Sequence, residues 1–329
     1  MADPVLDVRD LSTHLFVDAG RVRAVDEVSL RVMPGEAVAL VGESGCGKTM
    51  TALSLMRLAR PPARIVAGEV RFEGRDLLGL DETAMRRLRG GRIAMVFQDP
   101  MTFLNPLMRV GEQIAETIRL HQAVAARDVR AIVLGALRRV RIPAPETVID
   151  YYPHQLSGGM RQRVLIAIAI ASSPALLIAD EPTTALDVTV QSQIMRLLAD
   201  LRREIGGAML LITHDLGLVA EYCDRIYVMY AGRIVEEGDV RSIFARPRHP
   251  YTRALLRSTL SPTRRVESFE SIDGHPPNLI RPPLGCRFHP RCPEAIARCG
   301  SAEPAFAASA GGGGARCWLA EEGSHAPAA

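Results

Sequence analysis

The chain of 329 residues predicts an α/β fold built around a mostly parallel sheet. Short apolar strands alternate with helical segments along most of the chain, which is the pattern of parallel strands joined by helices. A glycine-rich turn near residue 42 joins one strand directly to a helix. Polar and apolar residues alternate over residues 5–31, which adds an antiparallel β region at the N-terminal edge.

The first half of the chain supplies strands and then a helical insertion. Residues 36–41 form an apolar strand, and residues 48–58 form a helix that Pro61 and Pro62 stop. Residues 92–97 form a strand that ends at Gln98. From about residue 110 to 140 the pattern is helical and rich in Ala, Arg and Leu. We therefore expect a helical subdomain, about residues 100–172, inserted into the sheet domain.

The second half returns to alternating elements. We expect helices over 158–170 and 188–204, and strands over 175–180, 208–213 and 225–229. Past about residue 240 the composition changes to Pro, Arg and Cys, with a glycine run at 311–314. This part has too few aliphatic residues to bury a core alone. The predicted domains are a sheet domain, residues 1–245, and a small Cys-rich extension, residues 246–329.

Composition disfavours several functional classes. The 40 basic and 37 acidic side chains give a net charge of only +3, so a nucleic-acid binder is not indicated. The first residues lack the basic start and apolar run of a signal peptide. The most apolar stretch, residues 164–179, is interrupted at Ser172 to Pro174 and is too short for a membrane span. We expect neither export nor a membrane-spanning helix.

A phosphate loop of the pattern G-x-x-x-x-G-K-[ST] occupies residues 42–49. The candidate nucleotide-binding residues are Gly42, Glu43, Ser44, Gly45, Cys46, Gly47, Lys48, Thr49 and Met50. Glycines let backbone N–H groups face the phosphates. Lys48 is suited to the β- and γ-phosphates, and the Thr49 hydroxyl to Mg²⁺. The alternative is a flexible turn with a surface lysine, against which the preceding strand and following helix argue.

Polar residues end three other predicted strands. Asp180 and Glu181 follow the buried strand at 175–180. Asp180 suits a Mg²⁺ ligand and Glu181 a base for the attacking water, with a solvated helix cap as the alternative for the pair. Gln98 ends another strand and is a candidate contact to Mg²⁺ or that water. His214 ends a third and is a candidate γ-phosphate contact.

The pentapeptide from Leu156 to Met160 is informative because it occurs together with the phosphate loop. Ser157, Gly158 and Gly159 stand at a predicted helix start, which is a second phosphate-binding surface. The nucleotide bound by the chain's own loop cannot reach it. We therefore expect a dimer that closes over ATP, with half a site on each face.

These motifs in this order resemble an ABC ATPase over roughly residues 5–245. The motifs are the phosphate loop, Gln98, residues 156–160, Asp180-Glu181, Thr184-Ala185-Leu186-Asp187 and His214. The resemblance implies the ABC cassette form of the P-loop NTPase fold, with the serine and glycines of residues 157–159 on the γ-phosphate of the opposite subunit. It also implies that Asp187 lies at the dimer seam. Met160 replaces the family's usual glutamine. Phe16 is the candidate for stacking on adenine, or else a core residue.

A narrower resemblance is to the dipeptide/oligopeptide importer ATPases, in segments 97–101, 152–155, 179–191 and 248–252. The signature that ends in Met160 is similar to the D-type member of the ATPase pair, whereas Phe103 replaces a common serine. The resemblance implies an ATPase that powers import, peripheral at the cytoplasmic face of the cell membrane. The implied partners are a paralogous ATPase in a heterodimer, two permease subunits and an extracytoplasmic solute-binding protein. Glutathione, glycosides and nickel chelates are alternative solutes to peptides.

Four of the six cysteines, Cys286, Cys292, Cys299 and Cys317, lie near the C-terminus. They resemble the tail of the same importer group, which implies a [4Fe–4S] cluster. Four soft ligands in a reducing compartment suit iron–sulfur or zinc. Spacings of five, six and seventeen residues are too open for a zinc ribbon. Zinc and free thiols remain alternatives.

Two other functions remain open. A soluble ABC ATPase linked to nucleic acids would typically carry tandem cassettes, coiled-coil inserts or basic zinc modules, and the sequence shows none. The other open function is an iron-based sensor, in which the cysteine tail gates the ATPase.

Overall fold

The computed structural model describes residues 3–184, 186–258, 272–308 and 313–321. Contacts divide the chain into two compact units. The first unit consists of residues 1–6, 32–36 and 72–211, and the second of residues 7–31, 37–71 and 212–329.

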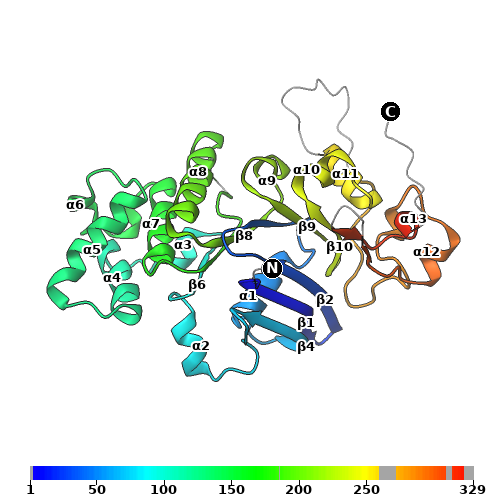
Figure 1. Cartoon of the computed structure of the whole chain (residues 1–329), viewed down its shortest axis with the longest axis horizontal. Coiled ribbons are helices and arrows are strands. Elements are labelled where there is room, and N and C mark those ends of the chain that lie inside the picture. Colours follow the sequence, from blue (N-terminus) through cyan, green and yellow to red (C-terminus); the bar gives the residue numbers. More distant parts are fainter. Residues whose placement is uncertain (1–2, 185, 259–271, 309–312, 322–329) are drawn as a thin grey trace. The chain divides into compact units, whose positions relative to one another are not determined.

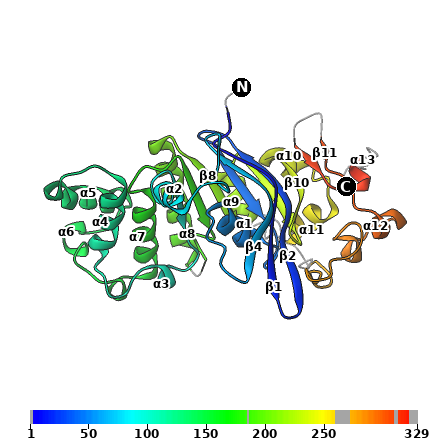
Figure 2. The same ribbon diagram turned by 90° about the horizontal axis from the view of Figure 1, so that it is seen from below.

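The first unit holds a parallel strand pair and the helical insertion. Its elements are β5 (Arg75–Asp76), α2 (Glu82–Leu88), β6 (Ile93–Val96), α3 (Pro100–Phe103), α4 (Val110–His121), α5 (Ala126–Arg139), α6 (Pro145–Val148), η1 (Pro153–Gln155), α7 (Gly158–Ile170), β7 (Leu176–Asp180), α8 (Val188–Ile205) and most of β8 (Ala208–Thr213). β6 and β7 pair in parallel, with Ile93 opposite Leu176 and Val96 opposite Ala179. The helices α4, α5, α6 and α7 gather as a bundle beside them (Figures 1 and 2).

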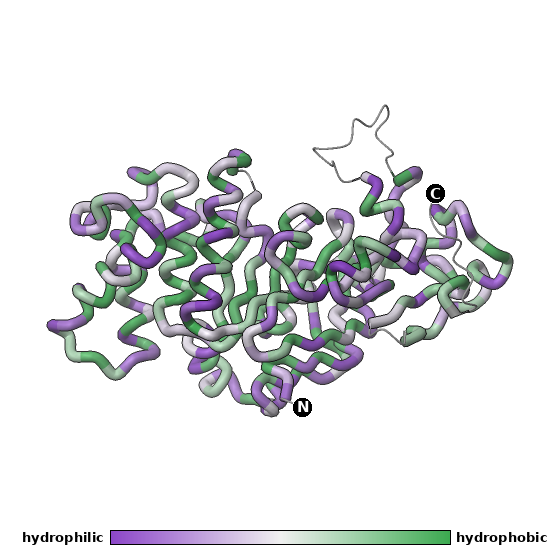
Figure 3. Tube along the Cα trace, turned by 45° about the horizontal axis from the view of Figure 1, so that its top comes forward, coloured by the Kyte–Doolittle hydropathy of each residue, from purple (hydrophilic) through white to green (hydrophobic). Residues whose placement is uncertain are grey.

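Local sequence accounts for the helices of this unit. Asp187 caps α8, because its carboxylate accepts a hydrogen bond from the N–H of Val190 at 2.9 Å. Gly206, with a φ of 66°, ends the helix in the left-handed conformation. The apolar residues at helical spacing in α8 are buried, as expected. Figure 3 shows hydrophobic and hydrophilic residues alternating along many of the helices, and α8 is a helix that buries one apolar face.

The second unit holds the N-terminal β region, the glycine turn and the C-terminal part of the chain. Its elements are β1 (Leu6–Val17), β2 (Gly20–Val32), β3 (Ala37–Val41), α1 (Lys48–Leu55), β4 (Ala63–Phe72), α9 (Leu216–Tyr222), β9 (Arg225–Tyr230), β10 (Arg233–Asp239), α10 (Val240–Ala245), α11 (Pro250–Ser258), η2 (His289–Arg291), α12 (Ala297–Ser301), β11 (Ala307–Ala308), β12 (Gly314–Ala315) and α13 (Trp318–Glu321). β1 lies between β2 and β4, and a tight turn joins β1 to β2 as a hairpin.

The larger sheet of the second unit is mixed. β3 pairs with β9 in parallel, whereas β10 pairs antiparallel with both β9 and β12. Ala231 and Gly232, with φ of 48° and 87°, form the tight turn between β9 and β10. The fold class predicted from the sequence, a mostly parallel core with antiparallel additions, is therefore confirmed.

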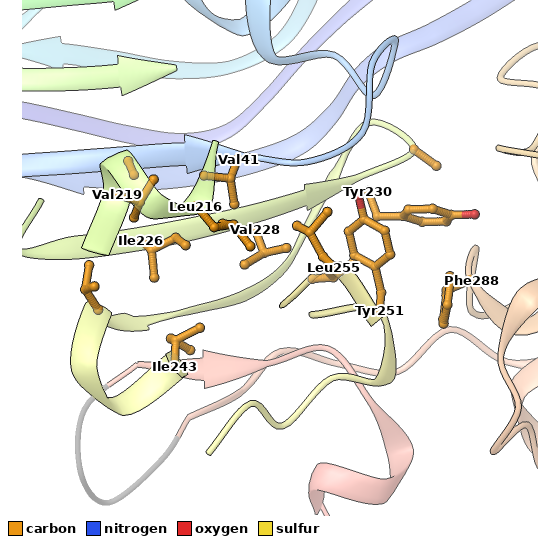
Figure 4. Packing of buried hydrophobic residues seen from close by; sticks show 14 residues of the cluster. Val41, Leu216, Val219, Ile226, Val228, Tyr230, Ile243, Tyr251, Leu255 and Phe288 are labelled. Carbon is orange, nitrogen blue, oxygen red and sulfur yellow. The ribbon is translucent and has the colours of Figure 1, made fainter. Parts of the chain in front are cut away.

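One apolar cluster of the second unit joins this sheet to the C-terminal part of the chain (Figure 4). Val41 and Val228 of the strands belong to the same buried cluster as Tyr251 and Leu255 of α11 and Phe288. The described part of the predicted extension, residues 246–329, thus shares a core with the sheet through Tyr251, Leu255 and Phe288. This supplies the aliphatic surface that its own composition lacks.

Some elements differ from those predicted. Helix α1 ends at Leu55, three residues before the expected end, because the chain turns at Arg57 with a φ of 50°. β4, β10 and α2 were not predicted. Most of β4 is exposed or half-buried, so it lacks the strong apolar alternation by which strands are recognised.

Candidate nucleotide site

The phosphate loop connects β3 to α1 and depends on two glycines. Gly42 has a φ of 153° and Gly47 a φ of 114°, a conformation that side chains rarely adopt. A Cβ atom on Gly42 would lie 2.1 Å from the carbonyl oxygen of Met229. One on Gly47 would lie 2.1 Å from that of Ala24. Close backbone packing therefore dictates glycine at both positions.

Lys48 begins α1, and the loop itself holds its ammonium group. Lys48 Nζ donates to the carbonyl oxygens of Gly42 at 2.8 Å and Glu43 at 3.0 Å, and the side chain is buried. Phosphate oxygens are charged and accept stronger hydrogen bonds than these carbonyls. The lysine is thus ready to transfer its bonds to a nucleotide. Thr49 is exposed and Met50 half-buried on the same helix.

The acidic strand end lies in the first unit. Asp180 ends β7 and is buried, and Glu181 follows it with a left-handed φ of 44°. Oε2 of Glu181 accepts hydrogen bonds from Gln98 Nε2 at 3.1 Å and Thr184 Oγ1 at 2.9 Å. Two strand ends predicted from the sequence meet here.

The predicted second phosphate-binding surface is the start of α7. Ser157 caps this helix by accepting a hydrogen bond from the N–H of Met160 at 3.3 Å, and Ser157 and Gly158 are exposed. A Cβ atom on Gly159 would lie 2.9 Å from a methyl group of Val190, in the first turn of α8. Because Asp187 caps α8, the two helix starts lie together on the first unit.

The remaining predicted residues are placed as follows. Phe16 lies in β1 with 44% of its surface exposed, and Arg64 lies over its ring at 5.5 Å. It is therefore no core residue, and its stacking on adenine remains a prediction. His214 follows β8 and is exposed. Ala185 of the Thr184–Asp187 motif lies outside the described residues.

A phosphate loop with its lysine and an acidic strand end are the two parts of a P-loop ATPase. Comparison with known families agrees. The family described as "ABC transporter" matches residues 25–184, and "Oligopeptide/dipeptide transporter, C-terminal region" matches residues 235–299. The chain belongs to the family of ABC transporter ATP-binding proteins and is an ATP-hydrolysing transporter subunit.

Relatives that match over nearly the whole chain support this family assignment. The chain is 52% identical over 323 residues to the "Probable peptide ABC transporter ATP-binding protein y4tR" of Sinorhizobium fredii, covering 98% of this chain and 96% of the relative. It is 50% identical to the "Dipeptide transport ATP-binding protein DppD" of Haemophilus influenzae, with 91% of each chain covered. Among solved structures, the dimeric ATP-binding cassette MJ0796 bound to ADP and Pi matches with a TM-score of 0.65. That match has 28% identity and covers 72% of this chain and 99% of the cassette.

The four C-terminal cysteines line one small cavity of the second unit. Cys286 and Cys299 are brought together at Gly285, where a Cβ atom would lie 2.4 Å from the carbonyl oxygen of Cys299. Burial, with a contribution from the neighbouring thiols, raises the pKa of Cys286 to about 12 and that of Cys292 to about 11. Thiols in this setting stay protonated at neutral pH unless a bound cation displaces their protons.

His249 adds a polar atom to the lining of this cavity. Its Nδ1 accepts a hydrogen bond from the N–H of Tyr251 at 3.0 Å, so the neutral ring carries its proton on Nε2. That Nε2 is buried and has no hydrogen-bond partner. Four soft donors and a spare N–H fit an anionic iron–sulfur group. In the described part of the chain, however, no three His, Cys, Asp or Glu side chains are placed to hold a metal ion as they lie.

Two residues contact the phosphate loop in a way that no sequence pattern indicated, although one of them, Tyr251, lies in the segment 248–252 singled out above. The hydroxyl of Tyr251 accepts a hydrogen bond from the N–H of Glu43 at 2.9 Å, and Arg291 pairs with the Glu43 carboxylate. Both lie far along the chain in the C-terminal part.

Across the described residues, no helix is long and apolar enough to cross a membrane.

Proposed function

We propose that this chain powers the import of di- and oligopeptides by binding and hydrolysing ATP as one half of an ATPase dimer. The observation that carries the proposal is the start of α7, where Ser157 and Gly158 are exposed and Gly159 is half-buried. A helix start with free N–H groups is an anion site. Its exposure supports a role in binding the γ-phosphate of ATP held by another subunit.

The chemistry follows from the parts described. Lys48 binds the β- and γ-phosphates, and Thr49 and Asp180 hold Mg²⁺. Glu181 acts as base for the attacking water, and Gln98, hydrogen-bonded to it, orients that water. His214 contacts the γ-phosphate. ATP drives transport because it binds the closed dimer more tightly than the open one.

The partners follow from the family and the relatives' names. The ATPase works with two membrane permeases and an extracytoplasmic solute-binding protein, and it lies peripherally at the cytoplasmic face of the membrane. The Met-ending signature supports a paralogous ATPase, rather than a second copy, as the other half of the dimer. Peptides are the solute because relatives of about half identity are named for peptide transport.

We also propose a [4Fe–4S] cluster on Cys286, Cys292, Cys299 and Cys317, which line one cavity but must draw closer together to hold it. When bound, the cluster would cross-link four segments that have little core of their own. It would also supply redox chemistry. The test is anaerobic purification followed by iron and zinc analysis and ultraviolet-visible absorption. Replacing the four cysteines by serine should abolish iron binding, whereas Cys223→Ser should retain it. Zinc, or no metal, in the anaerobic protein would contradict the cluster.

Transport is tested by reconstituting this chain in liposomes with peptide-importer permeases and a second ATPase of the same family. Uptake of labelled dipeptides should depend on ATP and on the loaded solute-binding protein, and Lys48→Ala should abolish it. Glutathione, a glycoside and a nickel chelate are the comparison solutes. Stimulation of ATP hydrolysis by one of these, and not by peptides, would overturn the peptide assignment while leaving the ATPase intact.

A further inference from the structure

Glu43 is an acidic residue inside a loop that binds phosphates. It is the second residue of the loop, directly after Gly42. A free carboxylate at this position repels an incoming nucleotide. The structure shows that the carboxylate is not free.

Arg291 neutralises Glu43 through a two-pronged ion pair. Its Nη1 lies 2.7 Å from Oε2 of Glu43 and its Nη2 lies 3.0 Å from Oε1. Only 5% of the Arg291 side chain and 24% of the Glu43 side chain are exposed, so water screens the pair weakly. A two-pronged pair also fixes direction, because the planar guanidinium fits the carboxylate in one orientation.

The rest of the Arg291 guanidinium is fixed as well. Its Nε donates to the carbonyl oxygen of Asp273 at 2.8 Å and its Nη2 to that of Ile272 at 3.0 Å. The Nη1 also donates to the hydroxyl of Tyr230 at 3.3 Å. An arginine held at this many points is an anchor for the carboxylate rather than a mobile surface charge.

Tyr251 holds the backbone of the same residue. Its hydroxyl accepts the hydrogen bond from Glu43 N–H, and its ring packs against Tyr230 and Phe288 with centroids 4.5 and 5.4 Å apart (Figure 4). The backbone of Glu43 is therefore held by Tyr251 and its side chain by Arg291. The glycines that let the loop curl also leave it flexible, so outside support lowers the entropy lost on binding.

We propose that Arg291 and Tyr251 are positioning residues of the phosphate loop, and that the C-terminal part of the chain thereby sets the affinity for ATP. Neither residue touches the reacting atoms. They act through Glu43, by removing its charge from the phosphate site and by holding the loop in its binding shape. Because coupling is reciprocal, ATP in turn stabilises the segment that carries Arg291.

The test is ATP affinity of the full chain, measured with a fluorescent nucleotide. Arg291→Gln should weaken binding by about tenfold, within the usual range for coupled sites. Tyr251→Phe keeps the ring and should weaken binding less. The KM for ATP should rise more than kcat falls, because positioning acts on binding. Arg291→Lys should restore part of the affinity, since it returns the charge without the planar fork.

Arg253→Gln is the matched control. Arg253 pairs with Glu294 at 2.7 Å in the same part of the chain, whereas the described partners of the Glu43 N–H and carboxylate are Tyr251 and Arg291. It should bind ATP as the unaltered chain does. A double-mutant cycle with Glu43→Gln completes the test, because the Arg291→Gln effect should shrink when Glu43 is already neutral.

Two results would overturn the inference: unchanged ATP affinity in a folded Arg291→Gln chain, or additive effects in the cycle. Thermal unfolding and iron content of each variant separate a loop effect from damage near Cys292. The inference rests on ATP binding at this loop. Failure of the unaltered chain to bind ATP in the same assay would instead count against the proposed function.

Discussion

Two neighbouring side chains orient the carboxylate of Glu181. Gln98 and Thr184 both donate to the same oxygen, Oε2. An oriented base needs little rearrangement when substrate binds, which is how preorganised groups contribute to rate. Substitution of Glu181 therefore tests the chemistry of hydrolysis directly.

Glu181→Gln should retain ATP binding while hydrolysis falls by roughly two orders of magnitude or more, as for loss of a general base. The amide keeps the size of the side chain but cannot take a proton from water. Single-turnover hydrolysis and nucleotide binding, measured on the same preparation, separate the two effects. Glu146→Gln, an exposed glutamate of α6, is the control. Near-normal turnover in Glu181→Gln would remove Glu181 from this role.

Gly47→Ala should abolish nucleotide binding and destabilise the second unit. The methyl group meets the carbonyl oxygen of Ala24 at 2.1 Å, and the φ of 114° is unfavourable for alanine. Gly135→Ala is the control, because nothing lies within 4 Å of its Cβ position in α5. That change should leave ATP binding intact and stabilise the helix by about 0.5–1 kcal/mol. Urea unfolding and nucleotide titration report both effects.

Among the elements, the starts of α7 and α8 connect structure to assembly. Ser157 caps α7 and Asp187 caps α8. Gly159 has no side chain, so the first turn of α7 can approach Val190 in the first turn of α8. A dimer that buries these starts would satisfy N–H groups that a lone chain leaves to water.

Ser157→Ala should weaken ATP-dependent dimerisation while leaving ATP binding by the lone chain unchanged. The change removes the hydroxyl that we propose to bind the opposite γ-phosphate, together with a cap worth about 1 kcal/mol. Light scattering in the Glu181→Gln background, where ATP persists, measures the dimer. Asp81→Ala removes a cap from α2 without a phosphate role. Equal loss of dimer in both variants would assign the effect to helix stability alone.

The starts and ends of these helices could be predicted from the sequence because serine, aspartate and glycine at their ends act locally. The helices at 158–170 and 188–205 match the prediction to within one residue. Contacts between distant segments could not be predicted. Arg291 and Glu43 are separated by 248 residues, and the fold alone brings them together. The same holds for Gln98 and Glu181, whose strand-end positions could be predicted but whose hydrogen bond could not.

At the scale of the whole molecule, the C-terminal part is integral to the second unit. Tyr251, Leu255 and Phe288 complete the apolar cluster around β9, and Arg287 reaches the buried carboxylate of Asp26. Composition correctly indicated that this part cannot bury a core alone. It could not reveal that the sheet supplies the other half of the core.

Asp26→Asn should destabilise the chain by about 3–5 kcal/mol, because it leaves buried Arg287 without its counter-charge. Burial raises the pKa of Asp26, but Arg287, Arg233 and Arg23 outweigh burial and hold it below its usual range, with His14 also facing it. A lowered folded-state pKa gives stability that is full above the unfolded value of 3.8 and is lost as pH falls through the folded value.

Urea unfolding across pH 2–7 measures this prediction. The unaltered chain should lose stability steeply in acid, and Asp26→Asn should show a flatter acid limb. Asp18→Asn, in the exposed turn between β1 and β2, should behave as the unaltered chain. An acid limb of unchanged steepness in Asp26→Asn would show that other carboxylates dominate.

The exposed signature at the start of α7 also affects how much ATP a cell hydrolyses. A chain made in excess of its partners holds nucleotide at one loop but has no second surface closing over the γ-phosphate. We expect such a surplus chain to hydrolyse ATP very slowly. Fuel consumption would then follow the number of complete transporters in the membrane rather than the number of ATPase chains synthesised, and uneven expression of the subunits would waste little energy.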